Sequence, residues 1–396
     1  MGGAFIAFLI TVFAIAVLTR DGYAFVLLYL FSGAFLLSRW WTARTAGKIE
    51  YSRHFEPLAF PGEQVSVVVK VNNRSRLPVV WLHAQESLPL EISNIKVIRR
   101  VFSLPPSGSD RLEYLLSPQK RGYYPLGPLQ LNTGDILGLA QEKTIQGQRD
   151  FLTVYPKVIP LTQVGLPSHS PLGDLRHTQP IFEDPARPIG KRDYHTGDSL
   201  RRIDWKASAA VQRLQVKIFE PSVALETAIF LDLAAEDYHP KFRYFASELA
   251  IVVAASLANW VIQRRQAVGL MVNGSDASLS TSETVQPIPP RKGRPHLMRL
   301  LQTLARVQLA PAGSFTNLLR QNRFDLSWGS TVIVITGQAG NDLFDTLFQF
   351  QRRGLHTVLV LCGDILGIKD IQAKAAHFAI PLFHFREEKD LEVWRK

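Results

Sequence analysis

The residues most able to do chemistry lie in one short stretch, RDYHTGDSLRRIDWKASA, residues 192–209. It combines carboxylates, guanidinium groups, a histidine and an indole. Asp198 or Ser199 is placed to cap a helix after a turn at Gly197. The apolar residues that follow recur at helical spacing, at Leu200, Ile203, Ala207 and Ala210. We therefore expect a capped helix that begins near Ser199.

Two interpretations of this stretch are open. In the first, Arg201 or Arg202 forms an ion pair with a nearby carboxylate. That carboxylate is Asp198 or Asp204, and Trp205 fills a gap between domains, so the stretch is architecture. In the second, the same side chains form a surface that another protein binds.

A second candidate site begins at Asp232, which follows the apolar run AIFL. We interpret that run as a buried strand of an α/β sheet, in which ligands bind beyond the carboxyl ends of the strands. An acidic residue at such an end is a candidate metal ligand. The arrangement resembles the von Willebrand factor type A domain. That family's metal site has the pattern Asp-x-Ser-x-Ser, a threonine in a later loop and an aspartate after a central strand.

The sequence departs from this pattern at several ligand positions. Alanine and Glu236 replace the two serines, Thr316 matches the family's threonine, and no aspartate follows Thr336. Mg²⁺ prefers octahedral oxygen ligation, and too few oxygen donors are left. We therefore predict a degenerate site, formed by Asp232, Glu236 and Thr316, that holds no metal. The alternative is a metal-assisted hydrolase that uses Asp232 and nearby carboxylates, with Glu236 or Asp342 as substitutes for the missing ligands.

Other enzymatic chemistry has little support in the sequence. There is no Gly-rich phosphate loop, no Gly-x-Ser-x-Gly elbow and no His-Glu-x-x-His pair. No nucleophile accompanies His195, a possible general base. The single cysteine, Cys362, lies in an apolar run and permits neither an internal disulfide nor a cysteine zinc cluster. We predict a protein that is not an enzyme and has no cofactor.

The elements that carry these residues are preceded by two long apolar runs, around residues 2–18 and 23–40. Each is close to the minimum of about 17 residues for a membrane-spanning helix. A signal peptide is disfavoured because no basic residue precedes the first run. Basic residues instead follow the second run, at Arg39, Arg44 and Lys48, which places the larger C-terminal part in the cytoplasm. We predict a multi-pass anchor, residues 1–48, in the inner (plasma) membrane.

Three further segments follow this anchor. Residues 49–155 contain short strands of period two, such as EQVSVVVKV, and predict an antiparallel β-sandwich. Residues 156–222 are interpreted as a linker, rich in proline and turn residues as far as about Lys191, followed by the signature stretch described above. In residues 223–396 apolar strands alternate with helices, which predicts an α/β domain with a largely parallel, Rossmann-like sheet. The expected fold is therefore multidomain.

The stretch at 192–209 is similar to the signature of the bacterial "domain of unknown function 58" family. That signature has the form Arg-x-Tyr-x-x-Gly-Asp-x-x-Arg-x-Ile-Asp-Trp-x-x-Ser-Ala. An earlier block, KRGYYPLGPLQLNTGDILGLA, also resembles the family, at residues that include Asp135, Gly138 and Leu139. The family's usual arginine after Ser-Ala is Ala210 here. The signature matches at Arg192, Tyr194, Gly197, Asp198, Ile203, Asp204, Trp205, Ser208 and Ala209, and its second arginine falls in the pair Arg201 and Arg202.

This resemblance implies a membrane hairpin, a β-sandwich and a cytoplasmic type A-like domain. It also implies a MoxR-type AAA+ ATPase as partner, in the assembly or maturation of an unidentified client protein at the membrane. The net charge of +11 is compatible with an anionic membrane surface, an acidic partner or nucleic acid. No aromatic and basic residues interleave on a strand, so we predict no specific nucleic-acid binding.

Overall fold

The structure of the chain is a computed structural model. It describes residues 2–19, 22–134, 143–162, 164, 183–195, 198–221, 226–278, 285–310, 314–322 and 326–394. The chain divides into two compact units, Met1–Lys157 with Leu301–Arg306, and Val158–Leu300 with Val307–Lys396. Asp135, Gly138, Leu139 and Gly197, which carry part of the family resemblance, lie outside the described residues.

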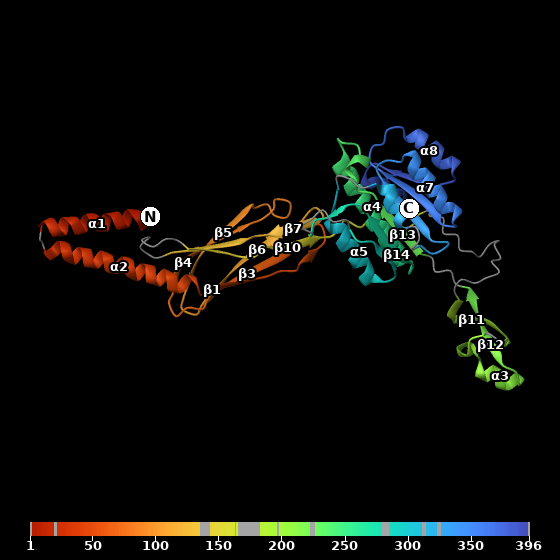
Figure 1. Cartoon of the computed structure of the whole chain (residues 1–396), viewed down its shortest axis with the longest axis horizontal. Coiled ribbons are helices and arrows are strands. Elements are labelled where there is room, and N and C mark those ends of the chain that lie inside the picture. The colour runs from red at the N-terminus through yellow and green to blue at the C-terminus, as the bar shows by residue number, and fades with distance from the viewer. Residues whose placement is uncertain are drawn as a thin grey trace. The chain divides into compact units, whose positions relative to one another are not determined.

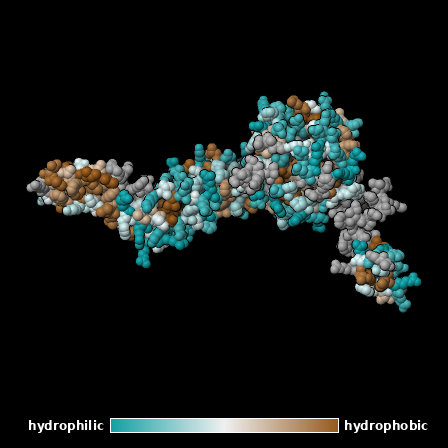
Figure 2. Space-filling view, viewed as in Figure 1, coloured by the Kyte–Doolittle hydropathy of each residue, from teal (hydrophilic) through white to brown (hydrophobic). Residues whose placement is uncertain are grey.

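The first unit begins with two apolar helices, α1 (Gly2–Thr19) and α2 (Gly22–Ala46). They pack side by side through aromatic rings, with the Phe8 and Phe31 centroids 5.6 Å apart. Most of their large apolar side chains face outward, and Figure 2 shows this surface as largely hydrophobic. By length and composition α2 could cross a membrane, whereas α1 contains a shorter apolar helix, Phe5–Leu18. The two predicted apolar helices are therefore present.

The rest of the first unit is built from β-strands arranged in three sheets, with strand orders β1-β3-β6, β5-β4-β8-β9 and β2-β10-β7. The sheets share one apolar core. In β3 the alternate residues Val65, Val67, Val69 and Val71 are buried, as the period-two pattern predicted. The strands are β1 (Ile49–His54), β2 (Leu58–Ala59), β3 (Val65–Asn73), β4 (Val79–Ser87), β5 (Val97–Leu104), β6 (Ser109–Leu116), β7 (Gly122–Leu126), β8 (Leu129–Thr133), β9 (Lys143–Gln146) and β10 (Asp150–Val154).

The second unit contains a small hairpin, here called the signature unit, residues 183–221. Its strands β11 (Glu183–Asp193) and β12 (Gln215–Pro221) are antiparallel. Between them lie a short 3-10 helix, η1 (Leu200–Arg202), and α3 (Trp205–Val211). Two interpretations of the sequence were wrong at this point. Part of the supposed linker is strand β11, and the α-helix begins at Trp205 rather than near Ser199.

The rest of the second unit is built around a six-stranded sheet, with the strand order β16-β14-β13-β18-β19-β20. Numbered along the chain these strands read 3-2-1-4-5-6, which is the doubly wound order. All neighbours are parallel except the pair β14 and β16. The strands are β13 (Glu226–Leu231), β14 (Ala267–Val272), β16 (Ile288–Arg291), β18 (Thr331–Thr336), β19 (His356–Cys362) and β20 (Leu382–Phe385).

Helices connect these strands and cover the sheet (Figure 1). The helix α4 is apolar on all sides and largely buried, as expected for a helix packed in a core. A second apolar cluster joins the sheet to α6, α7 and α8. The remaining elements are η2 (Ala235–Asp237), α4 (Arg243–Gln263), β15 (Ser275–Asp276), α5 (Arg294–Arg306), β17 (Val307–Gln308), α6 (Phe315–Asn322), α7 (Asn341–Arg352), α8 (Ile368–His377) and η3 (Glu388–Trp394).

Candidate functional site

In the signature unit, Asp198 is held by a two-pronged ion pair with Arg192. The guanidinium donates to both carboxylate oxygens, each at 2.7 Å, and the backbone N–H of His195 donates to Oδ2 at 2.9 Å. The Arg192 hydrogen bonds and this backbone N–H lower the pKa of Asp198 to about 2. The partner of Asp198 described here is thus Arg192, whereas the sequence had suggested Arg201 or Arg202. Arg192, at the end of β11, reaches across the turn instead.

Asp204 caps the helix α3, the role that the sequence had suggested for Asp198 or Ser199. Its Oδ1 accepts from the N–H of Ala207 at 3.1 Å, and its Oδ2 lies 2.9 Å from Nζ of Lys191. These two contacts lower the pKa of Asp204. A lysine from β11, Lys191, is thus a cation that pairs with Asp204.

Ser208 and Tyr194 connect α3 and the turn to strand β12. Ser208 Oγ donates to the carbonyl of Asp204 at 2.8 Å and accepts from the N–H of Gln215 at 2.9 Å. The N–H of Tyr194 donates to the carbonyl of Leu214 at 2.9 Å. Several polar signature residues therefore stabilise the hairpin itself.

Large apolar side chains of the signature unit are left on the surface. Trp205 is 67% exposed. Leu200, Val211 and Leu214 are exposed as well, and Figure 2 shows apolar surface on this unit. Arg202 is also exposed. Since exposed tryptophan and leucine side chains gathered on one small unit are typical of contact surfaces, this unit is a candidate for docking.

The second candidate site lies at the carboxyl ends of β13 and β18, where the order of the strands reverses. Ligands of doubly wound sheets bind at this point. Asp232 is 1% exposed there. Its Oδ1 accepts from Asn273 Nδ2 at 2.7 Å and from the N–H of Ala234 at 3.0 Å, and its Oδ2 accepts from Thr336 Oγ1 at 2.7 Å. Internal donors therefore occupy both carboxylate oxygens.

Burial and the nearby carboxylate of Asp237 raise the pKa of Asp232 to about 7. The three donors act in the opposite direction, but all are neutral groups. Sequence reasoning missed Asn273, although it directly follows β14, whose carboxyl end lies beside that of β13. The rule that led to Asp232 would have found Asn273, had the order of the strands been known.

The predicted residues Glu236 and Thr316 do lie with Asp232, around a cavity of about 270 Å³. Thr316 Oγ1 is 2.8 Å from Ser314 Oγ. Acidic and hydroxyl groups dominate the lining, which is Asp232, Glu236, Asp237, Ser314, Phe315, Thr316, Gln338, Gly340, Asp342 and Leu343. We call this cavity the acidic crevice.

Oxygen donors of the acidic crevice are of the type that bind hard cations. Both oxygens of Asp232 already accept internal hydrogen bonds, two at Oδ1 and one at Oδ2. In the part of the chain that the structure describes, no three His, Cys, Asp or Glu side chains are grouped as a metal site. The other carboxylates that line the crevice are Glu236, Asp237 and Asp342.

Comparison with known proteins places the signature in a known family. Residues 190–362 match the family described as "Protein of unknown function DUF58". This segment is a DUF58 domain. A Bacillus subtilis relative, "Uncharacterized protein YeaD", is 25% identical over 291 residues, 71% of this chain and 68% of that protein. The Mycobacterium tuberculosis protein "Uncharacterized protein Rv1480" is 28% identical over 129 residues, 32% of this chain and 38% of that protein.

Two solved structures are similar to parts of this chain at low identity. An aerotolerance-related membrane protein from Bacteroides fragilis has 14% identity and a TM-score of 0.29, with 43% of this chain and 95% of that chain covered. The CARDB domain of PF1109 from Pyrococcus furiosus has 12% identity and a TM-score of 0.19, with 27% and 91% covered. The family assignment therefore comes from sequence, and it confirms the resemblance that the signature residues suggested.

Proposed function

We propose that the chain is a membrane-anchored interaction protein, a non-catalytic adaptor that docks a partner through its signature unit. One observation carries the proposal. The carboxylates of Asp198 and Asp204 are each paired internally with a cation, while Trp205 and its apolar neighbours are exposed. Paired charges of this kind stabilise a local shape, and an exposed indole supplies contact area, so the unit suits recognition better than catalysis.

The anchor in this proposal is the pair α1 and α2, in the inner (plasma) membrane as a multi-pass segment with the remaining chain in the cytoplasm. The outward apolar surface of both helices supports membrane insertion. The basic residues Arg39, Arg44 and Lys48 that follow support the cytoplasmic orientation.

The partner in this proposal is the MoxR-type AAA+ ATPase that the family resemblance implies, acting on an unidentified client protein. We also assign the α/β sheet to the type A-like class. Support comes from its 3-2-1-4-5-6 order and from the position of the acidic crevice at the reversal point.

Binding between the full chain, held in lipid nanodiscs, and the purified MoxR-type ATPase of the same organism tests the proposal. Trp205→Ala is expected to weaken binding by tenfold or more, because a central tryptophan typically contributes at least about 2 kcal/mol to an interface. Phe245→Ala is the matched control, because Phe245 is an aromatic residue that is 72% exposed but lies in α4. Unchanged affinity of Trp205→Ala, or equal loss in both variants, contradicts the proposal.

The alternative function is a metal-assisted hydrolase at the acidic crevice. It is favoured by the rim carboxylates Glu236, Asp237 and Asp342, which line a cavity large enough for a small substrate. Metal analysis of the purified full chain separates the two functions. Stoichiometric Mg²⁺, Mn²⁺ or Ca²⁺ in the unaltered chain that is lost in Asp342→Asn supports the hydrolase. If the unaltered chain contains no such metal ion, the hydrolase lacks the group that would polarise its substrate.

A further inference from the structure

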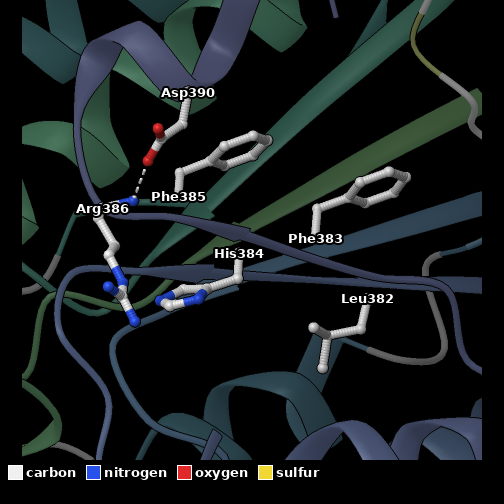
Figure 3. Close-up of a pocket in the computed structure, with 6 residues that line it drawn as sticks. All are labelled: Leu382, Phe383, His384, Phe385, Arg386 and Asp390. Carbon is white, nitrogen blue, oxygen red and sulfur yellow. Dashed lines mark hydrogen bonds between the residues drawn. The ribbon is translucent and has the colours of Figure 1, made fainter. Parts of the chain in front are cut away.

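A cavity of about 400 Å³ in the α/β domain follows the edge strand β20 (Figure 3). We call it the edge groove. It is lined by Leu382, Phe383, His384, Phe385, Arg386 and Asp390. Side chains of successive strand residues point to opposite faces of a sheet, and Figure 3 shows this alternation. A cavity that contacts five consecutive residues therefore runs along the open side of the strand.

Backbone groups of β20 face this groove. The carbonyls of Pro381 and Phe385 accept from the N–H groups of Leu359 and Gly363, each at 2.9 Å. Because alternate residues direct their N–H and C=O groups to opposite sides of a strand, those of Leu382 and His384 point away from β19. Among the described residues, no strand pairs with this outer side of β20.

The two edges of the sheet differ in how they are protected. The opposite edge strand, β16, has the sequence IPPR, and its two prolines, Pro289 and Pro290, lack the N–H that a further strand requires. Proline is a common means of blocking strand addition at a sheet edge. The sequence of β20, LFHF, contains no proline. One edge is therefore blocked by its sequence, and the other keeps its hydrogen-bonding groups and borders a cavity.

Charged and apolar groups along the edge groove define what it can accept. Arg386 and His384 both line the groove, and Figure 3 shows their side chains. Nε2 of His384 lies 2.8 Å from the carbonyl of Gly363 and must donate to it, which leaves Nδ1 as the other ring nitrogen. Asp390 is already engaged, because its Oδ2 accepts from the N–H groups of Arg386 and Glu387. Arg386 is exposed and available for a carboxylate.

We propose that β20 binds an extended peptide segment of a partner protein as an added strand, with an acidic side chain of that segment paired with Arg386. Backbone hydrogen bonds to Leu382 and His384 supply affinity in this mode of recognition, and the pockets beside the strand supply selectivity. The edge groove lies outside the signature unit. The two surfaces can therefore be tested separately, and failure of one does not remove the other.

Selection of phage-displayed random peptides on the full chain in lipid nanodiscs tests the proposal. Peptides with β-branched residues and an aspartate or glutamate are expected to be enriched. A synthetic peptide of the enriched sequence is then expected to bind Arg386→Glu at least tenfold more weakly than the unaltered chain, because the ion pair becomes a repulsion. The matched control is Lys369→Glu, which makes the same charge change on the exposed surface of α8 and is expected to bind normally.

Hydrogen exchange at single-residue resolution identifies the mode of binding. The N–H groups of Leu382 and His384 are expected to exchange rapidly in the free chain and slowly with peptide, whereas those of Phe383 and Phe385 change little. Slow exchange of Leu382 and His384 without peptide would mean that the edge is already covered. Light scattering then shows whether the chain is a dimer, in which a second copy covers the edge, or a monomer, in which the chain covers its own edge. Either result overturns the proposal. Absence of enriched acidic peptides, or binding that does not protect these two amides, overturns it as well.

Discussion

The signature unit and the acidic crevice both gather carboxylates, in opposite electrostatic settings. In the signature unit, Asp198 and Asp204 are each paired with a cation from β11, and the pKa of both is lowered. In the crevice, Asp232 is buried among neutral donors, and its pKa is raised to about 7. In this stretch, which is rich in ionisable residues, both of these carboxylates are therefore neutralised by a nearby cation. The sparser site holds the group that can change charge near neutral pH.

The largest expected effect is the loss of stability on removal of the Asp232 carboxyl group. Asp232→Ala leaves Asn273 Nδ2 and the N–H of Ala234 without their acceptor in a buried site, while Thr336 Oγ1 keeps the carbonyl of Gln338. We expect the free energy of unfolding to fall by about 3 kcal/mol, because unsatisfied buried groups typically cost about 1–3 kcal/mol each and partial relaxation offsets some of this. Denaturant unfolding of the full chain in detergent measures it. The exposed Glu236→Ala should change stability by less than about 0.5 kcal/mol. Similar losses in the two variants would mean that the hydrogen bonds of Asp232 do not stabilise the domain.

The next effect is a dependence of stability on pH that belongs to Asp232. Its pKa is raised from 3.8 to about 7 in the folded chain, so the folded state keeps a proton that the unfolded state releases between these values. The stabilising contribution is complete below about pH 4 and is lost as pH rises through about 7. The slope is at most about 1.4 kcal/mol per pH unit. Thermal unfolding between about pH 4 and pH 8 should show a weaker slope in Asp232→Asn, which stays neutral. Equal slopes would show that Asp232 does not titrate in this range.

The sequence predicted the crevice better than it predicted the signature unit. The strand before Asp232 is a continuous apolar run followed by a polar residue, and a local pattern is enough to place such a residue at the end of a strand. Asn273 could not be assigned to the site, because it approaches only when β14 pairs beside β13. That pairing depends on the order of strands rather than on any one segment.

The signature unit misled sequence reasoning because its ion pairs do not follow helical spacing. Arg192 meets Asp198 across a turn, six positions along the chain, whereas helix geometry favours partners three or four positions apart. Strand β11 contains two prolines and a glycine and has irregular register with β12, so it lacks the alternation that marks a strand. Its partner strand is separated from it by η1 and α3. The motif identified the family without revealing which residues touch.

The smallest expected effect comes from Asp198→Asn, which removes the ion pair with Arg192. Because the pKa of Asp198 is lowered, the pair stabilises the unit above the ordinary aspartate pKa of 3.8 and loses this effect as pH falls through about 2. At neutral pH we expect slightly faster amide exchange in β11 and β12 of the full chain, and no change around the acidic crevice. The Arg192–Asp198 pair can act as a local brace or contact the partner directly, and measurement of partner binding by Asp198→Asn distinguishes these two roles. Weaker binding together with faster exchange identifies the pair as a brace for the Trp205 surface, whereas weaker binding with unchanged exchange means that Arg192 and Asp198 contact the partner directly.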